Sequence, residues 1–157
     1  MELIDKLARY EVEDRGYETP CWIWQGADSG RGYGHVWIDG QHRYAHRAAW
    51  EAAYGPIPHG MEIDHKCRVR ACINPDHLRA ATKAQNMQNL NPRGLRGSRS
   101  RFRGVGLTDS GRWRAYGRRA GRYVHIGVFD DEATAAAAAA DFRRSHMPFS
   151  IEDRGVV

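Results

Sequence analysis

Short apolar segments, each bounded by Gly, Pro, Asp or Asn, recur from one end of the chain to the other. Their lengths predict several short strands and helices rather than a few long elements. At the start of the chain we expect a short helix over Leu3–Tyr10, an acidic connector over Glu11–Thr19 and a strand over Cys21–Trp24.

A β-hairpin is predicted around Asp39-Gly40, because this dipeptide tolerates the positive φ angles of a two-residue type I′ turn. Its two strands are expected within Gly32–Ile38 and Gln41–Ala45. A helix over His46–Tyr54 should follow and end at Gly55-Pro56, which is a stop signal.

Two further strands, Met61–His65 and His77–Ala80, are predicted to lie side by side. Next, Thr82-Lys-Ala-Gln85 matches the capping box, in which the Thr hydroxyl accepts from the third amide ahead and the Gln side chain reaches back. We therefore expect a helix from this point to about Leu90, with Asn86 near its first turn.

The rest of the chain predicts a separate small domain. Three strands are expected in it: Phe102–Leu107, Arg112–Gly117 and Tyr123–Val128. An alanine-rich helix should follow from Asp130 to Arg144, with acids at its start and arginines at its end to complement the helix dipole. The predicted class is α+β: one domain over residues 1–91, a basic linker over 92–99, and a three-stranded antiparallel sheet packed on one helix over 100–157.

Charge is distributed unevenly between these parts. Residues 1–91 hold 11 Lys and Arg against 12 Asp and Glu, whereas residues 92–157 hold 13 against 7, which gives net charges of −1 and +6. Between Pro92 and Arg122, ten arginines and a single acid are interleaved with aromatic residues. The alternative is a solvated surface, but the planar fork of arginine suits phosphates and guanine edges, so the pattern favours a nucleic-acid partner.

Length and composition narrow the class of protein. The chain of 157 residues has no apolar run of the roughly 20 residues that span a bilayer, and Met1–Tyr10 lacks the features of a signal peptide. Three cysteines cannot all pair, which favours metal ligation or free thiols over a disulfide framework. We expect a soluble, cytoplasmic protein with no membrane partner and no small-molecule cofactor; the oligomeric state is open, with a monomer favoured.

Soft metal ligands occur at regular spacing. Cys67-x4-Cys72-x4-His77 supplies two thiolates and an imidazole, and Cys21 is the remaining cysteine to complete a four-coordinate zinc shell. Such a structural zinc would fix the Arg-rich loop of residues 66–74 and contribute to folding. The alternative is that these residues are small buried side chains and a hydrogen-bonded histidine.

A second set of residues places oxygen atoms, the ligands that hard cations such as magnesium prefer, near an imidazole. Phosphodiester hydrolysis needs a base that deprotonates water and a cation that neutralises charge on the phosphate and on the leaving oxygen. His65 has a side chain that is largely neutral at cellular pH, and Asp64 and Asn86 offer the oxygen atoms that magnesium prefers. These three residues form the predicted catalytic site.

Together these residues resemble the ββα-metal nucleases of the HNH type, and especially the zinc-stabilised His-Cys box homing endonucleases of phages and introns. The resemblance covers residues 21 to about 90 and rests chiefly on Asp64-His65-Lys-Cys67, on Cys72-Ile-Asn-Pro-Asp-His77 and on Asn86. It implies that His65 is the general base, that Asn86 and Asp64 hold a catalytic magnesium ion, and that the Cys and His residues hold zinc. The pattern here is H…H…N, because the central and final letters are His77 and Asn86.

Two roles are possible for the basic residues upstream, which are Arg43, His46 and Arg47. They either contact the scissile phosphate or form a solvated start of the helix.

Residues 100–136 resemble the plant ethylene-response-factor, or APETALA-type, DNA-binding domain, whose three-stranded sheet lies in the major groove. Carried over by position, the contacts with double-stranded DNA would be Arg101, Arg103, Arg112, Trp113, Arg114, Tyr116 and Arg118. For Trp113, a place in the domain core is the alternative.

The predicted function is that of a site-directed DNA endonuclease of the phage homing type, acting in the cytoplasm of a bacterial or phage-infected cell. The C-terminal domain would find the target and the N-terminal domain would cut it, with zinc as the structural metal and magnesium as the catalytic one. One alternative is a DNA-binding regulator with a catalytically inactive nuclease fold. Another is a zinc-stabilised interaction module with no nucleic-acid role.

Overall fold

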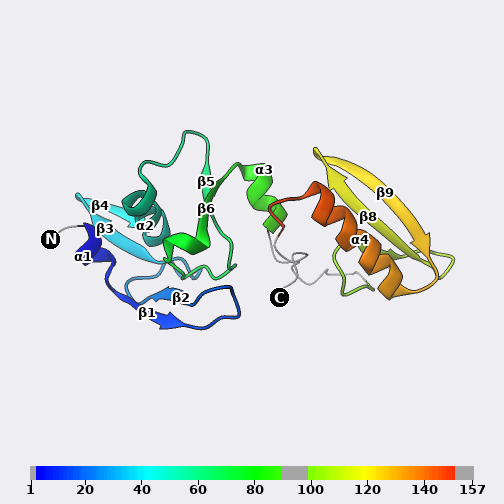
Figure 1. Ribbon diagram of the computed structural model, residues 1–157, viewed down its shortest axis with the longest axis horizontal. Coiled ribbons are helices and arrows are strands. Elements are labelled where there is room, and N and C mark those ends of the chain that lie inside the picture. The colour runs from blue at the N-terminus through cyan, green and yellow to red at the C-terminus, as the bar shows by residue number, and fades with distance from the viewer. Residues whose placement is uncertain (1–2, 90–98, 151–157) are drawn as a thin grey trace. The chain divides into compact units, whose positions relative to one another are not determined.

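The computed structural model describes residues 3–89 and 99–150, and its contacts divide them into two compact units, one ending at Met87 and the other beginning at Gln88 (Figure 1). The predicted basic linker lies outside the described residues except for Arg99. Within the described ranges, no helix has both the length and the apolar character needed to cross a bilayer.

The first unit is built from small two-stranded sheets and short helices. Its elements, in chain order, are α1 (Leu3–Leu7), β1 (Tyr10–Glu13), β2 (Cys21–Trp24), β3 (His35–Ile38), β4 (Gln41–Tyr44), α2 (Ala45–Tyr54), β5 (Glu62–His65), β6 (Leu78–Ala81) and α3 (Lys83–Asn86). The buried side chains of its core are Leu7, Trp24, Val36, Ile38, Ala45, Ala48, Ala49, Ile63, Ile73 and Leu78.

The beginning of the chain differs from the prediction. Helix α1 ends at Leu7 rather than Tyr10, and the expected connector is wrong in its first part, because β1 pairs with β2 in an antiparallel ladder. Tyr10 stacks on Trp22 with ring centroids 4.7 Å apart. The alternation of Tyr10-Glu-Val-Glu13 is the strand signal, and its acidic composition concealed it.

The predicted hairpin is confirmed. Strands β3 and β4 pair from His35–Tyr44 to Ile38–Gln41, and the turn between them has positive φ at both Asp39 (47°) and Gly40 (76°). Helix α2 follows directly and ends at Gly55, as the stop signal predicted.

Strands β5 and β6 pair antiparallel, from Glu62 opposite Ala81 to His65 opposite Leu78, which confirms the two predicted strands. The capping box is also present: the Thr82 hydroxyl accepts from the Gln85 amide, and the Gln85 side chain accepts from the Thr82 amide. The helix is shorter than expected, because α3 ends at Asn86 and a 3₁₀ turn over Met87–Asn89 follows; Leu90 lies outside the described residues. Two strands and a helix thus follow one another between residues 62 and 86.

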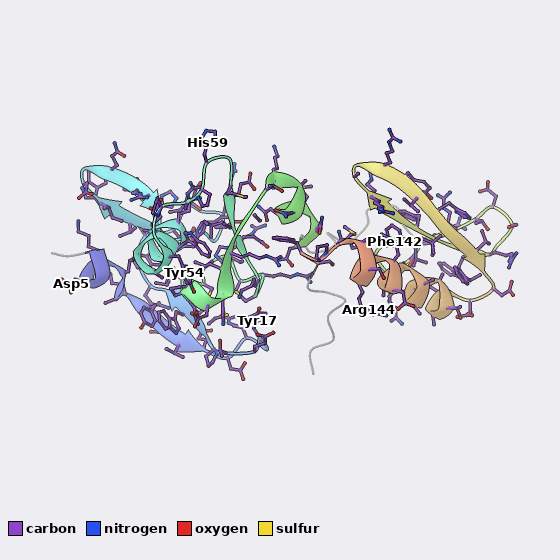
Figure 2. All side chains as sticks on the ribbon, turned by 45° about the horizontal axis from the view of Figure 1, so that its top comes forward. Asp5, Tyr17, Tyr54, His59, Phe142 and Arg144 are labelled. Atoms are coloured by element: carbon purple, nitrogen blue, oxygen red, sulfur yellow. The ribbon has the colours of Figure 1, made fainter. Side chains whose placement is uncertain are left out.

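The second unit has the predicted three-stranded antiparallel sheet with one helix packed on it. Its elements are β7 (Val105–Leu107), β8 (Trp113–Arg119), β9 (Arg122–Phe129) and α4 (Glu132–His146), with β8 in the centre of the sheet. Phe142 of α4, labelled in Figure 2, packs over Gly117 so closely that a Cβ atom there would lie 2.3 Å from its ring. A glycine in the central strand therefore lets the helix approach the sheet.

Candidate functional site

The four residues predicted as zinc ligands lie together in the first unit. Cys21 begins β2, Cys67 and Cys72 lie in the loop after β5, and His77 ends a 3₁₀ turn before β6; their ligand atoms are all within 4.8 Å of one another. The Nδ1 atom of His77 is 3.4 Å from Sγ of Cys21 and 3.5 Å from Sγ of Cys72. In a tetrahedral zinc shell a sulfur and a nitrogen lie about 3.6 Å apart. The cluster therefore has the donor set and the spacing of a metal site.

The other nitrogen of the His77 ring is also held. Its Nε2 atom lies 2.7 Å from the hydroxyl oxygen of Thr19, and the edge of the Tyr17 ring packs against the imidazole. If Nε2 donates to Thr19, the lone pair is on Nδ1, which faces the thiols; such outer hydrogen bonds orient histidine ligands at metal sites. Thr19 was missed at the sequence level because it lies in the expected connector.

Burial and hydrogen bonding shift the pKa values of the three thiols in different directions. Burial raises the pKa of Cys21 to about 11, and donation of a hydrogen bond to Cys72 raises the pKa of Cys67. That same bond lowers the pKa of Cys72 to about 5. Cys21, Cys72 and His77 are fully buried, so three neighbouring thiolates would be stable only around a positive ion.

His65, the last residue of β5, is fixed by the same loop. Its Nε2 atom is 3.0 Å from the backbone oxygen of Cys72, and only 7% of the residue is exposed. Burial lowers the pKa of His65 to about 4. Because Cys72 contributes its Sγ atom to the cluster and its carbonyl to His65, the position of the imidazole is coupled directly to the loop that carries Cys67 and Cys72.

Asp64 is buried and forms an ion pair with the next strand. Its Oδ2 atom accepts from Nε of Arg79 at 2.9 Å and lies 2.7 Å from the second guanidinium nitrogen. Arg79 lies directly opposite Asp64 in the β5–β6 ladder, which explains the contact. The guanidinium compensates a carboxylate that would be costly to bury alone.

Asn86 is held by a residue that the sequence analysis did not single out. Its Nδ2 atom donates to Oε2 of Glu62 at 2.6 Å. Glu62 begins β5 and Asn86 ends α3, so the bond joins the first strand to the helix. Since a carboxylate only accepts, the amide nitrogen must face Glu62, and the Oδ1 atom of Asn86 is left for another ligand.

The three basic residues upstream have different environments. His46 is 6% exposed and its ring centroid is 4.7 Å from that of His65, so a solvated helix start is wrong for this residue. Burial lowers the pKa of His46 to about 3. Arg43 forms an ion pair with Glu51, and Arg47 is half-buried on α2.

In the second unit, the predicted DNA contacts fall into two groups. Three of them lie on the central strand β8: Arg114, Tyr116 and Arg118. Arg114 and Tyr116 line an open polar hollow of about 640 Å³, and Arg118 is exposed. The Tyr116 ring also stacks on the ring of Tyr123 in β9, with centroids 5.4 Å apart. Tyr123 was not among the residues predicted from the sequence. Arg101 is exposed, with its guanidinium over the Phe102 ring.

The remaining predicted contacts have partners inside the unit. Trp113 packs against the core between sheet and helix, which is the alternative left open for it. Arg103 donates to the backbone oxygen of Gln88, and Arg112 pairs with Asp130 at 2.9 Å.

Comparison with known proteins gives one family model and several phage relatives. Residues 43–88 match the family model described as HNH endonuclease, a range that includes α2, β5, β6 and α3. The chain is 38% identical over 93 residues to Protein 2.8 of Escherichia phage T7, covering 57% of this chain and 60% of that protein. It is 34% identical over 74 residues to Protein 7.7 of the same phage, covering 47% of this chain and 57% of that protein.

A third relative, the uncharacterized gene 5.3 protein of Enterobacteria phage T3, is 43% identical over 51 residues, which cover 32% of this chain and 50% of that protein. The chain thus spans between 50% and 60% of the length of these curated phage relatives. No solved structure matches it. The segment that carries His65, Asp64 and Asn86 is therefore similar to HNH endonucleases, and the similar proteins are encoded by phages.

Proposed function

We propose that the first unit hydrolyses phosphodiester bonds in double-stranded DNA as an HNH-type endonuclease, and that the second unit binds the target. The observation that carries this proposal is the position of His65. It ends the first strand of a strand–strand–helix segment that matches the HNH family model, and a backbone carbonyl of the metal-binding loop fixes its ring.

The hydrogen bond to Cys72 supports the base assignment. A carbonyl oxygen can only accept, so Nε2 of His65 carries the proton and the lone pair of the neutral ring is on Nδ1. Because burial keeps the ring neutral at cellular pH, Nδ1 can accept a proton from the attacking water. His65 is thus the proposed general base.

Two different metals are proposed. Zinc would be held by Cys21, Cys67, Cys72 and His77, and its role would be to fix the loop whose carbonyl positions His65. Magnesium would be held by the oxygen atoms of Asn86 and Asp64, and when bound it supplies positive charge to the phosphate and the leaving 3′ oxygen. The donor sets fit these assignments, because thiolates and imidazole suit zinc and amide and carboxylate oxygens suit magnesium.

Glu62 has a positioning role in this account. It accepts from the amide nitrogen of Asn86 and thereby turns the amide oxygen away from itself, toward the proposed cation. Arg79 has a comparable role for Asp64, since it compensates and orients the buried carboxylate.

For the second unit, we propose that DNA lies on the face of the sheet that bears Arg114. Its chain neighbour Ala115 is buried in the core shared with α4, so alternation along β8 places Arg114 on the opposite face. The basic and aromatic residues there would supply phosphate and base contacts in the manner of the ethylene-response-factor domain. Arg101, Arg114, Tyr116 and Arg118 are the contacts we retain, and Tyr123 joins them.

A homing-type, site-directed activity in the infected bacterial cell is the finer form of the proposal. It is supported by the phage origin of the relatives and by the division of the chain into one unit that carries the candidate active site and another that carries the basic residues. Cleavage would leave a 5′ phosphate and a 3′ hydroxyl.

The direct test is nicking of supercoiled plasmid by the full chain with and without Mg²⁺, beside His65→Ala and a matched control, His59→Ala. His59 is exposed in the loop before β5 and is labelled in Figure 2. We expect Mg²⁺-dependent nicking that falls by about 10²–10⁴-fold in His65→Ala and is unchanged in His59→Ala. Tight DNA binding without nicking by the parent protein would instead support a DNA-binding regulator.

A further inference from the structure

The outer face of the β3–β4 hairpin carries aromatic rings that the proposed mechanism does not use. Val36 and Ile38 are buried in the core, so alternation along β3 turns His35 and Trp37 to the other face. Across the hairpin, Tyr44 lies opposite His35 and His42 lies opposite Trp37. We call these four residues, together with Tyr33 in the preceding loop, the ring row.

The ring row is continuous from the hairpin to the candidate base. Its centroid distances, taken in order toward the active site, are Trp37–His42 4.6 Å, His42–His35 6.2 Å, His35–Tyr44 4.7 Å, Tyr44–Tyr33 6.0 Å and Tyr33–His65 6.0 Å. Each ring centroid lies within 6.2 Å of the next, so the row joins the exposed face of the hairpin to the candidate base.

Its two largest rings on the hairpin are exposed. Trp37 is 55% exposed and Tyr44 is 44% exposed, although the core of the unit buries most other large apolar side chains. Contiguous exposed apolar patches mark interaction sites, whereas single exposed apolar residues are common. The row contributes little to the core. Arg70 lies over the Tyr33 ring, 5.4 Å from its centroid, so Trp37 and Tyr44 are the exposed rings offered to a partner.

One nitrogen atom in the row and one beside it have no hydrogen-bond partner among the described residues. Nε2 of His35 and Nδ1 of His46 are buried and have no hydrogen-bond partner within the part of the chain that the structure describes. His46 is 6% exposed and packs against Tyr33, Tyr44 and His65. Such groups are uncommon in a finished core and are typical of functional sites.

The chemistry of the row selects one class of partner. Arg43, on β4, is paired with Glu51, so the hairpin offers π faces rather than phosphate-binding cations. Aromatic faces stack on nucleobases without regard to sequence, but a base exposes its face only where it is unpaired.

We propose that the ring row binds unpaired bases of the DNA strand next to the phosphate that is cut, by stacking chiefly on Trp37 and Tyr44. This inference rests on the proposed nuclease function. It implies that the protein prefers DNA with a locally opened segment, such as a bubble or a branch, over a perfect duplex.

The test measures binding alone, with the full chain in the His65→Ala background so that no cleavage intervenes. The probes are a fluorescein-labelled duplex and the same duplex with a short unpaired bubble. Trp37→Ala and Tyr44→Ala are compared with Tyr54→Ala, an aromatic residue of the same unit that is 53% exposed on α2 and lies outside the row (Figure 2). We expect each row variant to bind the bubble at least about fivefold more weakly, with duplex binding and the Tyr54→Ala protein unchanged.

A second readout uses the exposure of Trp37, the one tryptophan exposed among the described residues. Its fluorescence should be quenched by the bubble probe, and Trp37→Phe should lose the quenching while keeping the affinity, because Phe still stacks. Equal bubble affinity in all variants would overturn the proposal. Equal losses of affinity for the bubble and the duplex would also overturn it. A parent dimer that dissociates in Trp37→Ala would overturn it too, because the row would then be a contact between two copies of the chain. A parent protein that binds bubbles through the row but cuts no DNA would refute the nuclease function instead.

Discussion

The contact between Glu62 and Asn86 allows a sharp test of how the proposed magnesium site is built. Their 2.6 Å hydrogen bond is charge-assisted, and such bonds contribute about 1.5–3 kcal/mol. If the bond serves to aim the amide oxygen of Asn86, its removal releases the amide to rotate. At about 1.4 kcal/mol per tenfold change, the loss is roughly 10- to 150-fold in rate at limiting Mg²⁺. Glu62 is half-buried, so we expect the lower part of this range.

Two substitutions separate orientation from direct metal binding. Glu62→Ala removes the acceptor, whereas Glu62→Gln keeps an oxygen that accepts from Asn86 and removes only the charge. The assay is the initial rate of plasmid nicking across a Mg²⁺ titration. We expect Glu62→Ala to be about 10- to 30-fold slower at limiting Mg²⁺, with Glu62→Gln close to the parent. If Glu62→Gln were as slow as Glu62→Ala and both recovered at high Mg²⁺, Glu62 would itself be a metal ligand and the reasoning would be refuted.

Other predictions address the rest of the structure. Cys72→Ser should lose bound zinc, measured by metal analysis, and lower the melting temperature. The structural metal would be contradicted if the parent protein held no zinc and the substitution left the melting curve unchanged. Thr19→Val should weaken zinc binding about 10- to 100-fold in a chelator competition, because it removes the partner of the ligand's other nitrogen. Arg79→Met should destabilise the first unit by about 3–5 kcal/mol in urea denaturation, since Asp64 stays buried; an unchanged midpoint would argue against this ion pair. Arg114→Ala should weaken duplex binding and reduce the log–log salt slope by about one, which a filter-binding titration measures.

The parts of the fold that the sequence predicted are those with local signals. Asp39-Gly40 tolerates the positive φ angles that its turn requires, and the capping box at Thr82 depends on residues three positions apart. The spacing of the Cys and His residues predicted a cluster of candidate metal ligands, which the structure contains because Cys67, Cys72 and His77 lie in one loop and its flanks. Local chemistry of this kind can be recognised without knowledge of the tertiary structure.

Other features depend on tertiary contacts that no local pattern specifies. Strand β1 is stabilised by its pairing with β2 and by the Tyr10–Trp22 stack. Neither contact is visible in the local sequence, and the acidic composition alone suggested a connector. Glu62 was missed because its importance comes from a residue 24 positions away. The bond from His65 involves a backbone carbonyl, which leaves no trace in the choice of side chain. Only the register of the hairpin reveals the ring row, because its members are scattered through residues 33–44.

The measurement that tests the central claim most directly is chemical rescue of His65→Ala. The substitution removes a buried ring, and the space that it leaves would admit imidazole from solution. We predict that His65→Ala nicks plasmid at most at a hundredth of the parent rate. Added imidazole should restore Mg²⁺-dependent nicking in proportion to the concentration of its neutral form, and the parent protein should not respond. Nicking by His65→Ala at the parent rate without imidazole would contradict the account.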